Sequence, residues 1–154
     1  MTRKMDGDAE PDIVTRGGRR YGHRMSIDAD LKALATGKNF AALTTMLPSG
    51  QPQTQIMWVD ADDEHVLINT EVHRQKFKNI SADPRVTITV FNGANPYQYV
   101  EARGRVVDTE TGSSARENID ELSRKYTGND YGTTIQSERV IVRITPERIH
   151  KNGL

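Results

Sequence analysis

The sequence predicts a mainly β fold, an antiparallel barrel of six strands with three short helices. Six segments are rich in β-branched and aromatic residues, and turn signals of Gly, Pro, Asn and Asp separate most of them. Helical periodicity occurs in only three short segments, too few to alternate with the strands as a doubly wound parallel sheet requires. Strands that are mostly joined by hairpins close most simply into an antiparallel barrel.

The composition limits the size and class of the protein. A chain of 154 residues is enough for one ordinary domain and too short for two. Lys plus Arg and Asp plus Glu both number 21, and this balance argues against a nucleic-acid partner. The absence of Cys excludes disulfides, thiolate metal sites and Cys nucleophiles. Because no apolar run approaches the ~20 residues that span a bilayer and no signal peptide is evident, we expect a cytoplasmic protein without a membrane partner.

The chain divides into a predicted flexible arm, residues 1–24, and a folded domain, residues 25–154. The arm combines six Arg or Lys residues with four acidic residues and few large apolar ones, a composition that does not support a packed core. The domain opens with a short helix, because apolar residues at helical spacing follow Asp28 and Gly37 provides a stop.

The remaining elements follow from changes in hydrophobic period. The six predicted strands are residues 40–46, 53–60, 65–70, 85–91, 97–108 and 139–145. Gly104, inside the fifth strand, indicates a bend or bulge of the kind that curves barrels. A helix before the last strand is predicted to begin at a capping box formed by Ser114 and Glu117, and to end at Gly128.

The most informative stretch for function is a short helix predicted at residues 74–82. Arg74, Lys76 and Lys78 fall near its start, where cations are unfavourable because this end of a helix carries partial positive charge. The free N–H groups of a first helical turn bind anions, and nearby cations strengthen such a site. The arrangement therefore favours a phosphate site; a solvated basic face is the alternative.

Other chemically active groups give weaker signals. The four His residues are scattered without metal-ligand spacing, and no Ser stands in a nucleophile motif, so no metal site and no catalytic residue are predicted. Trp58 is the only tryptophan and lies in the middle of a predicted strand. We expect it in the core or at a dimer interface, and a planar ring system beside this strand is the functional alternative.

Several short segments occur in a familiar order. They are Phe40-Ala41-Ala42-Leu43-Thr44-Thr45, Gly50-Gln51-Pro52-Gln53, Met57-Trp58-Val59, Asn69-Thr70, Arg74-Gln75-Lys76-Phe77-Lys78-Asn79-Ile80 and Asp83-Pro84-Arg85-Val86. Together they resemble the pyridoxamine 5′-phosphate oxidase-like split-barrel superfamily. The helix at residues 120–128 and the strand at 139–144 are particularly similar to the branch that uses the deazaflavin coenzyme F420. The resemblance implies a split-barrel homodimer with two cofactors in grooves at the subunit interface.

The resemblance also implies a cofactor site. Its residues are Gln55, Ile56, Met57, Trp58, Asn69, Thr70, Arg74, Lys76 and Asn79. The first four match a strand that runs along the ring system. Asn69 and Thr70 match positions near the phosphate or the ribityl chain. Arg74 and Lys76 match the cations that clamp the phosphate, and Asn79 completes this motif.

The function that the resemblance implies is hydride transfer between reduced F420 and a small electron-poor acceptor. Gln55 stands where FMN-binding relatives often have Arg, and the sequence has no match to the C-terminal Arg and Trp segment of true pyridoxamine phosphate oxidases. The first departure argues against FMN, and the second argues against oxidation of vitamin B6. The alternatives are an FMN-dependent reductase on the same barrel and a non-catalytic protein that binds F420, haem or another tetrapyrrole.

Overall fold

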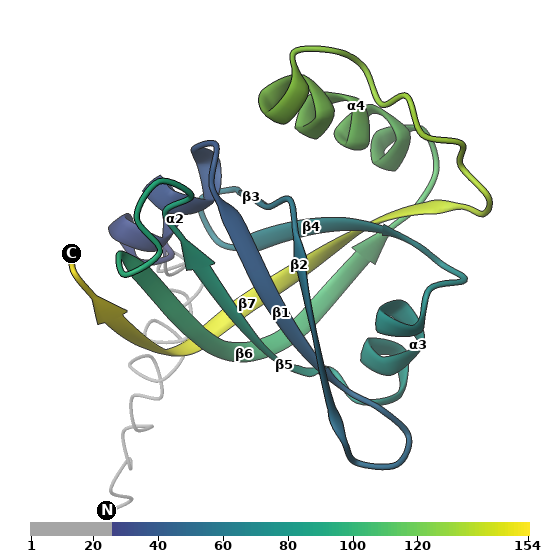
Figure 1. The fold of residues 1–154 in the computed structure, drawn as a ribbon. Helices are drawn as coiled ribbons and strands as arrows, with labels where there is room; N and C mark the ends of the chain where they lie inside the picture. The colour runs from purple at the N-terminus through teal and green to yellow at the C-terminus, as the bar shows by residue number, and fades with distance from the viewer. Residues whose placement is uncertain (1–25) are drawn as a thin grey trace, which may run out of the picture.

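The computed structural model describes residues 26–154, so the predicted arm at residues 1–24 lies outside the described part (Figure 1). The helices are α2 (Ala29–Thr36), α3 (Gln75–Ala82) and α4 (Ser113–Thr127). The strands are β1 (Phe40–Met46), β2 (Pro52–Met57), β3 (Asp60–Ala61), β4 (Val66–Glu71), β5 (Arg85–Phe91), β6 (Tyr99–Glu110) and β7 (Arg139–Asn152). The mainly β prediction is confirmed. No helix among the described residues is long and apolar enough to cross a membrane.

All the strands belong to one antiparallel sheet with the order β2-β1-β5-β6-β7-β4-β3. Figure 1 shows the long strands β6 and β7 curling across the molecule, with α2 near one end and α3 and α4 near the other. The sheet therefore has the curled, antiparallel form expected of a split barrel. Its two margins are formed by β2 and β3.

The prediction of six strands is wrong by one, because the segment predicted as residues 53–60 is divided. β2 pairs with β1, and the chain then passes through Trp58 and Val59 to β3, which pairs with β4 at the other margin. At the break, helix α4 takes the place of a neighbouring strand. Val59 donates its N–H to the Tyr126 hydroxyl, and its carbonyl accepts hydrogen bonds from Lys125 and Tyr126.

The core lies inside the curl of the sheet. Alternate residues of β1, β5 and β7 point inward, and α2 adds Leu31, Leu34 and Ala35. The alternation of apolar and polar residues in these strands therefore reflects one face of the sheet that is buried in the core, as expected for a sheet whose other face is exposed. A second, smaller apolar cluster joins Ile119, Leu122 and Tyr126 of α4 to Phe40, Trp58 and Tyr131.

The last strand is longer than the prediction of residues 139–145, because β7 continues past Pro146 to Asn152. A proline has no N–H for the ladder and is tolerated at bulges. The β6–β7 pairing shifts register between Arg103 and Gly104, beside Pro146. This register shift confirms the bend or bulge predicted at Gly104. The two strands approach closely there, because an added Cβ would lie 2.0 Å from the Thr145 carbonyl oxygen.

The helix termini agree with the prediction in all but one case. Asp28 caps α2 by accepting from the N–H groups of Asp30 and Leu31, and Gly128 ends α4 in the left-handed conformation. The predicted capping box at Ser114 is wrong. Gly112 is the N-cap of α4, with φ of 86° and no side-chain cap. Ser114 lies inside the first turn because glycine, which tolerates positive φ, reverses the chain after β6.

Candidate cofactor site

A cavity of about 340 Å³ lies between β4, the start of α3, helix α4 and the segment that leads into β7. Six of the nine predicted site residues line it: Met57, Trp58, Asn69, Thr70, Arg74 and Lys76. Five further lining residues were not predicted: Ile119, Leu122, Tyr131, Thr133 and Arg139. The cavity therefore combines a polar end with several cations and an apolar end with two aromatic rings.

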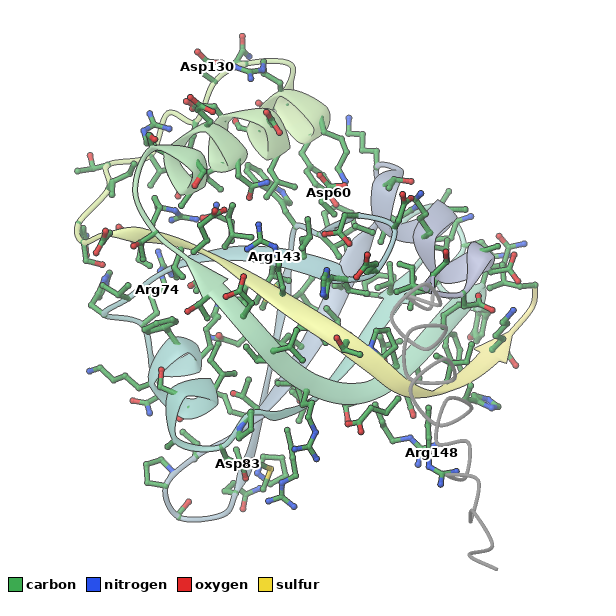
Figure 2. The ribbon with its side chains drawn as sticks, turned by 180° about the vertical axis from the view of Figure 1, so that it is seen from behind. Asp60, Arg74, Asp83, Asp130, Arg143 and Arg148 are labelled. Carbon is green, nitrogen blue, oxygen red and sulfur yellow. The ribbon has the colours of Figure 1, made fainter. Side chains whose placement is uncertain are left out.

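Three cations converge on the polar end. Arg74 is the N-cap of α3, Lys76 lies in the first turn of this helix, and Arg139 is the first residue of β7. Figure 2 shows Arg74 at the start of α3, close to the beginning of β7. Burial lowers the pKa of Lys76, and the positive charges of Arg74 and Arg139 lower it further. An anion in the cavity would relieve this repulsion.

Arg139 is buried, with only 7% of its surface exposed, and several contacts hold its side chain in place. Its Nε donates to the Asn69 Oδ1 at 2.8 Å, and its guanidinium lies 5.1 Å from the centre of the Tyr131 ring. Burial lowers the pKa of Arg139, while Tyr131 and Glu71 act in the opposite direction. Both N–H groups of the Asn69 amide are used, since they donate to the Ala115 carbonyl and to Asn118 on α4. Asn69 therefore orients Arg139.

Glu71 is a buried carboxylate behind the three cations. One oxygen accepts from the backbone N–H groups of Gln136 and Ser137, at 2.7 and 3.0 Å. The other lies 3.5 Å from Arg74 and 3.9 Å from Arg139. Burial alone would raise the pKa of Glu71, but these hydrogen bonds and the charge of Arg139 outweigh it, so the pKa is lowered. Glu71 is therefore a charged partner that holds both guanidinium groups.

Unused hydrogen-bond donors accompany the cations. Within residues 26–154 the Thr70 Oγ1 has no hydrogen-bond partner, although Thr70 is only 2% exposed, and Thr70 lines the cavity. Buried polar atoms are nearly always satisfied, so a water or a ligand atom is the expected partner of this hydroxyl. Arg74 makes no side-chain cap at the start of α3, which leaves the first N–H groups of this helix to another acceptor.

The apolar end of the cavity is built around Trp58. The Trp58 ring stacks on Tyr126 at a centroid distance of 5.1 Å, and Tyr131 meets it edge-on at 6.3 Å. Tyr126 cannot swing away, because its hydroxyl hydrogen-bonds with the backbone of Val59 and Asn39. Burial raises the pKa of Tyr126, so this phenol stays neutral. The result is a fixed aromatic wall beside the cation cluster.

Three predicted site residues do not line this cavity. Gln55 and Ile56 lie on the marginal strand β2, and Ile56 is 61% exposed. Asn79 is buried behind α3, where its amide donates to Thr45 and Gln53 and accepts from Gln75. Asn79 therefore fastens α3 to the β1–β2 hairpin, and any effect on a ligand would act through the position of that helix.

A larger cavity of about 410 Å³ lies elsewhere, beside β5 and β6, and contains none of the predicted residues. Three of its arginines are already paired with carboxylates: Arg85 with Asp83, Arg103 with Glu101 and Arg105 with Glu147. The hydrogen bonds from Arg85 lower the pKa of Asp83 to about 2. The fourth arginine of this cavity, Arg148, forms no ion pair within residues 26–154. Because three of the four charges are compensated, the smaller cavity has the stronger claim to a ligand.

No histidine within residues 26–154 lines the cavity. His65 pairs with Asp62, and His73 contacts the Ser137 hydroxyl. Neither His73 nor His150 is among the lining residues. Residues 26–154 contain no group of three His, Cys, Asp or Glu side chains arranged to hold a metal ion.

The most important residue that sequence reasoning missed is Arg139. In the sequence it appears only as the first residue of an alternating strand. The β4–β7 pairing places it directly opposite Glu71, and this register is a long-range property. Tyr131 was missed because it lies in a segment without regular structure. The sequence did offer one signal for a special role of Arg139. This charged residue directly precedes the aliphatic residues Val140, Ile141 and Val142.

Comparison with known proteins agrees with this fold. Residues 27–153 match the pyridoxamine 5′-phosphate oxidase family, and the chain belongs to that family. A solved structure of an F420 reductase is 28% identical, with a TM-score of 0.70, and the match covers 82% of this chain and 100% of that one. No curated protein sequence matches the chain.

Two further solved structures share the fold. A conserved hypothetical protein, Rv2991 from Mycobacterium tuberculosis, is 24% identical, with a TM-score of 0.64, over 81% of this chain and 83% of that one. The haem storage protein HutZ from Vibrio cholerae is 12% identical, with a TM-score of 0.58, over 84% of this chain and 97% of that one. The same barrel therefore occurs in proteins described as a reductase and as a haem store.

Proposed function

We propose that this protein is an oxidoreductase that uses coenzyme F420 to reduce a small electron-poor molecule. The observation that carries the proposal is the polar end of the cavity. There, Arg74, Lys76 and Arg139 line the cavity together with Thr70, whose hydroxyl has no hydrogen-bond partner within residues 26–154. The 28% identical F420 reductase supports this cofactor class, because the match spans all of that chain.

The residues present fit a phosphorylated ring cofactor. The three cations and Thr70 would hold the phosphate, where charge-assisted hydrogen bonds are strongest. Trp58 and Tyr131 would bound the apolar part of the ligand and keep water from it. The bound deazaflavin supplies hydride chemistry, and the protein contributes binding, orientation and exclusion of water. No lining side chain is assigned as a catalytic acid or base.

The proposal includes a homodimer with the cofactor near the subunit interface. Gln55 and Ile56 lie on β2 outside the cavity, and Ile56 is largely exposed. A second copy of the chain at this margin would cover Ile56 and would extend the apolar end of the cavity. The measurement is the molar mass in solution, and a monomer with full cofactor affinity would contradict this part of the proposal.

FMN is the second candidate cofactor, since it also ends in a phosphate on a ribityl chain. Equilibrium titration of the apoprotein with F420 and with FMN separates the two, with the fluorescence of the single tryptophan as readout. Trp58 lines the cavity, so quenching reports occupancy of this site. We expect tighter binding of F420. Binding of FMN alone would move the protein to the flavin branch, and binding of neither would remove the proposed activity.

Substitution of Lys76 tests the location of the site. We expect Lys76→Ala to weaken cofactor binding by about 1.5–3 kcal/mol, roughly tenfold to 150-fold in Kd, because a charge-assisted hydrogen bond is lost. Lys78→Ala is the matched control, since Lys78 lies on the same helix but not on the cavity wall. An unchanged Kd for Lys76→Ala would show that the phosphate binds elsewhere.

A further inference from the structure

The C-terminal half of β7 has a free backbone edge. β6 pairs with β7 along most of its length, but β4 pairs only with the first half, as far as Ile144. Within residues 26–154, no strand pairs with the other side of residues 148–152. Alternate residues of a strand direct their N–H and C=O groups to one side, so this edge offers donors and acceptors to an additional strand.

A cavity of about 220 Å³ lies at the start of this free edge. It is lined by residues 145–149 of β7, by residues 26–28 and by Glu64. None of these residues lines the cofactor cavity, and Figure 2 shows Arg148 far along β7 from Arg74. The cavity is therefore separate from the proposed cofactor site.

One apolar side chain of this cavity lies on the core face of the sheet without being covered. Ile149 pairs with Ala102, and the side chains of directly opposed residues lie on the same face of an antiparallel sheet. Ala102 is fully buried, whereas Ile149 is 38% exposed. The layer of core side chains therefore ends at Ile149 although the strand continues, and this face has a place for further apolar side chains.

The part of the chain that precedes Ser26 starts beside this cavity, because Ser26 is itself a lining residue. At about 3.3 Å per residue, residues 148–152 span roughly 17 Å, and residues 20–25 span roughly 20 Å when extended. Residues 20–25, which we call the arm segment, are therefore long enough to follow the whole free edge.

The sequence of the arm segment fits this edge. In an extended strand, Tyr21 and Met25 share one face, and Arg20 and Arg24 share the other. Tyr21 and Met25 supply apolar surface for the face on which Ile149 is uncovered. The alternation is the one expected of a strand that is half-covered by protein and half-exposed to water.

The charges of the two partners are complementary. Three of the lining residues are acidic, Asp28, Glu64 and Glu147, whereas the single cation among the described lining residues is Arg148. Residues 15–25 contain four arginines and no acidic residue. Two of the carboxylates already have a basic partner, so the remaining attraction is modest. It nevertheless favours an arginine-rich segment at this edge.

We propose that the arm segment, residues 20–25, binds along the free edge of β7 as an additional β-strand. The backbone of residues 148–152 supplies the hydrogen bonds, the apolar face of the segment covers Ile149, and its arginines lie near the acidic lining residues. An edge that is closed by its own chain is not available to strands of other molecules. The pairing does not depend on the proposed cofactor.

Amide hydrogen exchange of the whole 154-residue chain tests this pairing. Adjacent residues of a strand direct their N–H groups to opposite sides, so His23→Pro/Arg24→Pro removes one pairing N–H in either register. We expect the edge-facing amides of residues 148–152 to exchange roughly tenfold faster in this double variant than in the wild type, the factor for one lost hydrogen bond. Thr2→Pro/Arg3→Pro is the matched control, since it also adds two prolines and removes one arginine, and it should exchange like the wild type.

The dependence on protein concentration identifies what covers the edge. Slow exchange that is independent of concentration and is lost in His23→Pro/Arg24→Pro supports the proposal. Slow exchange that develops only at high concentration places a second molecule on the edge and overturns the proposal. Fast exchange of all these amides in the wild type shows an open edge, and equal rates in the wild type and the variant show that other residues cover it. Either result also overturns the proposal.

Discussion

At the scale of single residues, the arrangement of the cations in the cavity depends on the carboxylate of Glu71, which does not itself line the cavity. Glu71 lies behind the cations, and a buried ionised carboxylate is tolerated only with partners for its oxygens. Two backbone N–H groups and two guanidinium groups provide them. Glu71 thus reduces the repulsion between Arg74 and Arg139, and it fixes the segment that leads into β7.

Replacement of Glu71 should change how stability depends on pH. The pKa of Glu71 in the folded protein lies below its ordinary value of 4.5, so its ionised form contributes stability that is present above pH 4.5. This contribution is lost as pH falls through the lower folded pKa. We expect Glu71→Gln to be less stable than the wild type in urea at pH 7, with a smaller loss of stability between pH 5 and pH 3.

The control for this prediction is Glu117→Gln. Glu117 is exposed on α4, and its side chain forms no hydrogen bond or ion pair within residues 26–154. Its replacement should leave both the stability at pH 7 and the acid dependence close to those of the wild type. Parallel curves for the wild type and Glu71→Gln would show that Glu71 is not a stabilising charge in the folded protein.

Residue-scale prediction from sequence succeeds where the signal is local. Arg74 and Lys76 stand at a helix start that the sequence itself defines, and both line the cavity. Asn79 belongs to the same motif, yet its side chain is used to fasten α3. Arg139 could not be selected, because its role follows from the strand register that places it opposite Glu71.

At the scale of elements, the curl of the sheet depends on one close approach between β6 and β7. Gly104 lies beside a register shift, and its Cα faces the backbone of Thr145 and Pro146. A side chain there would meet backbone atoms, which cannot rotate away as a flexible side chain can. Glycine is therefore required at position 104 because a side chain would clash with the neighbouring strand. The backbone conformation is not the reason, since φ of Gly104 is not positive.

Gly104→Ala tests this contact. An added Cβ would lie 2.0 Å from the Thr145 oxygen, so the two longest strands must move apart. We expect a loss of unfolding free energy of at least about 1–3 kcal/mol, the usual cost of overpacking. Urea unfolding measures it. Gly132→Ala is the control, because within residues 26–154 no atom beyond its chain neighbours lies within 4 Å of its added Cβ. A stability equal to that of the wild type in both variants would refute the account.

The elements were predictable to the extent that their causes are local. The alternation in β1, β5 and β7 reports a buried face, and Asp28 and Gly37 mark the ends of α2. The division between β2 and β3 was not predictable, because it is made by the hydroxyl of Tyr126, which is distant in sequence. The continuation of β7 past Pro146 likewise depends on the irregular pairing with β6.

At the scale of the whole molecule, the cavity joins segments that are far apart in the chain. Its lining residues come from the end of β2, from β4, α3 and α4, and from the start of β7. A ligand that contacts all of them binds only the folded protein, so its binding free energy adds to the stability of the fold.

Ligand binding should therefore raise the melting temperature. A ligand present at a hundred times its Kd stabilises the folded state by about 2.7 kcal/mol, which corresponds to a shift of roughly 5–10 °C for a domain of this size. We expect F420 to produce such a shift, as measured by thermal unfolding. Lys76→Ala should show a smaller shift at the same ligand concentration, and equal shifts would indicate a site that does not include Lys76.

The open margins of the sheet have a consequence for handling the protein at high concentration. An unpaired marginal strand can template the addition of strands from other molecules, which leads to aggregation and amyloid. The two margins are guarded differently. β3 has only two residues and offers almost no template. β2 begins with Pro52, whose missing N–H removes one donor from this edge.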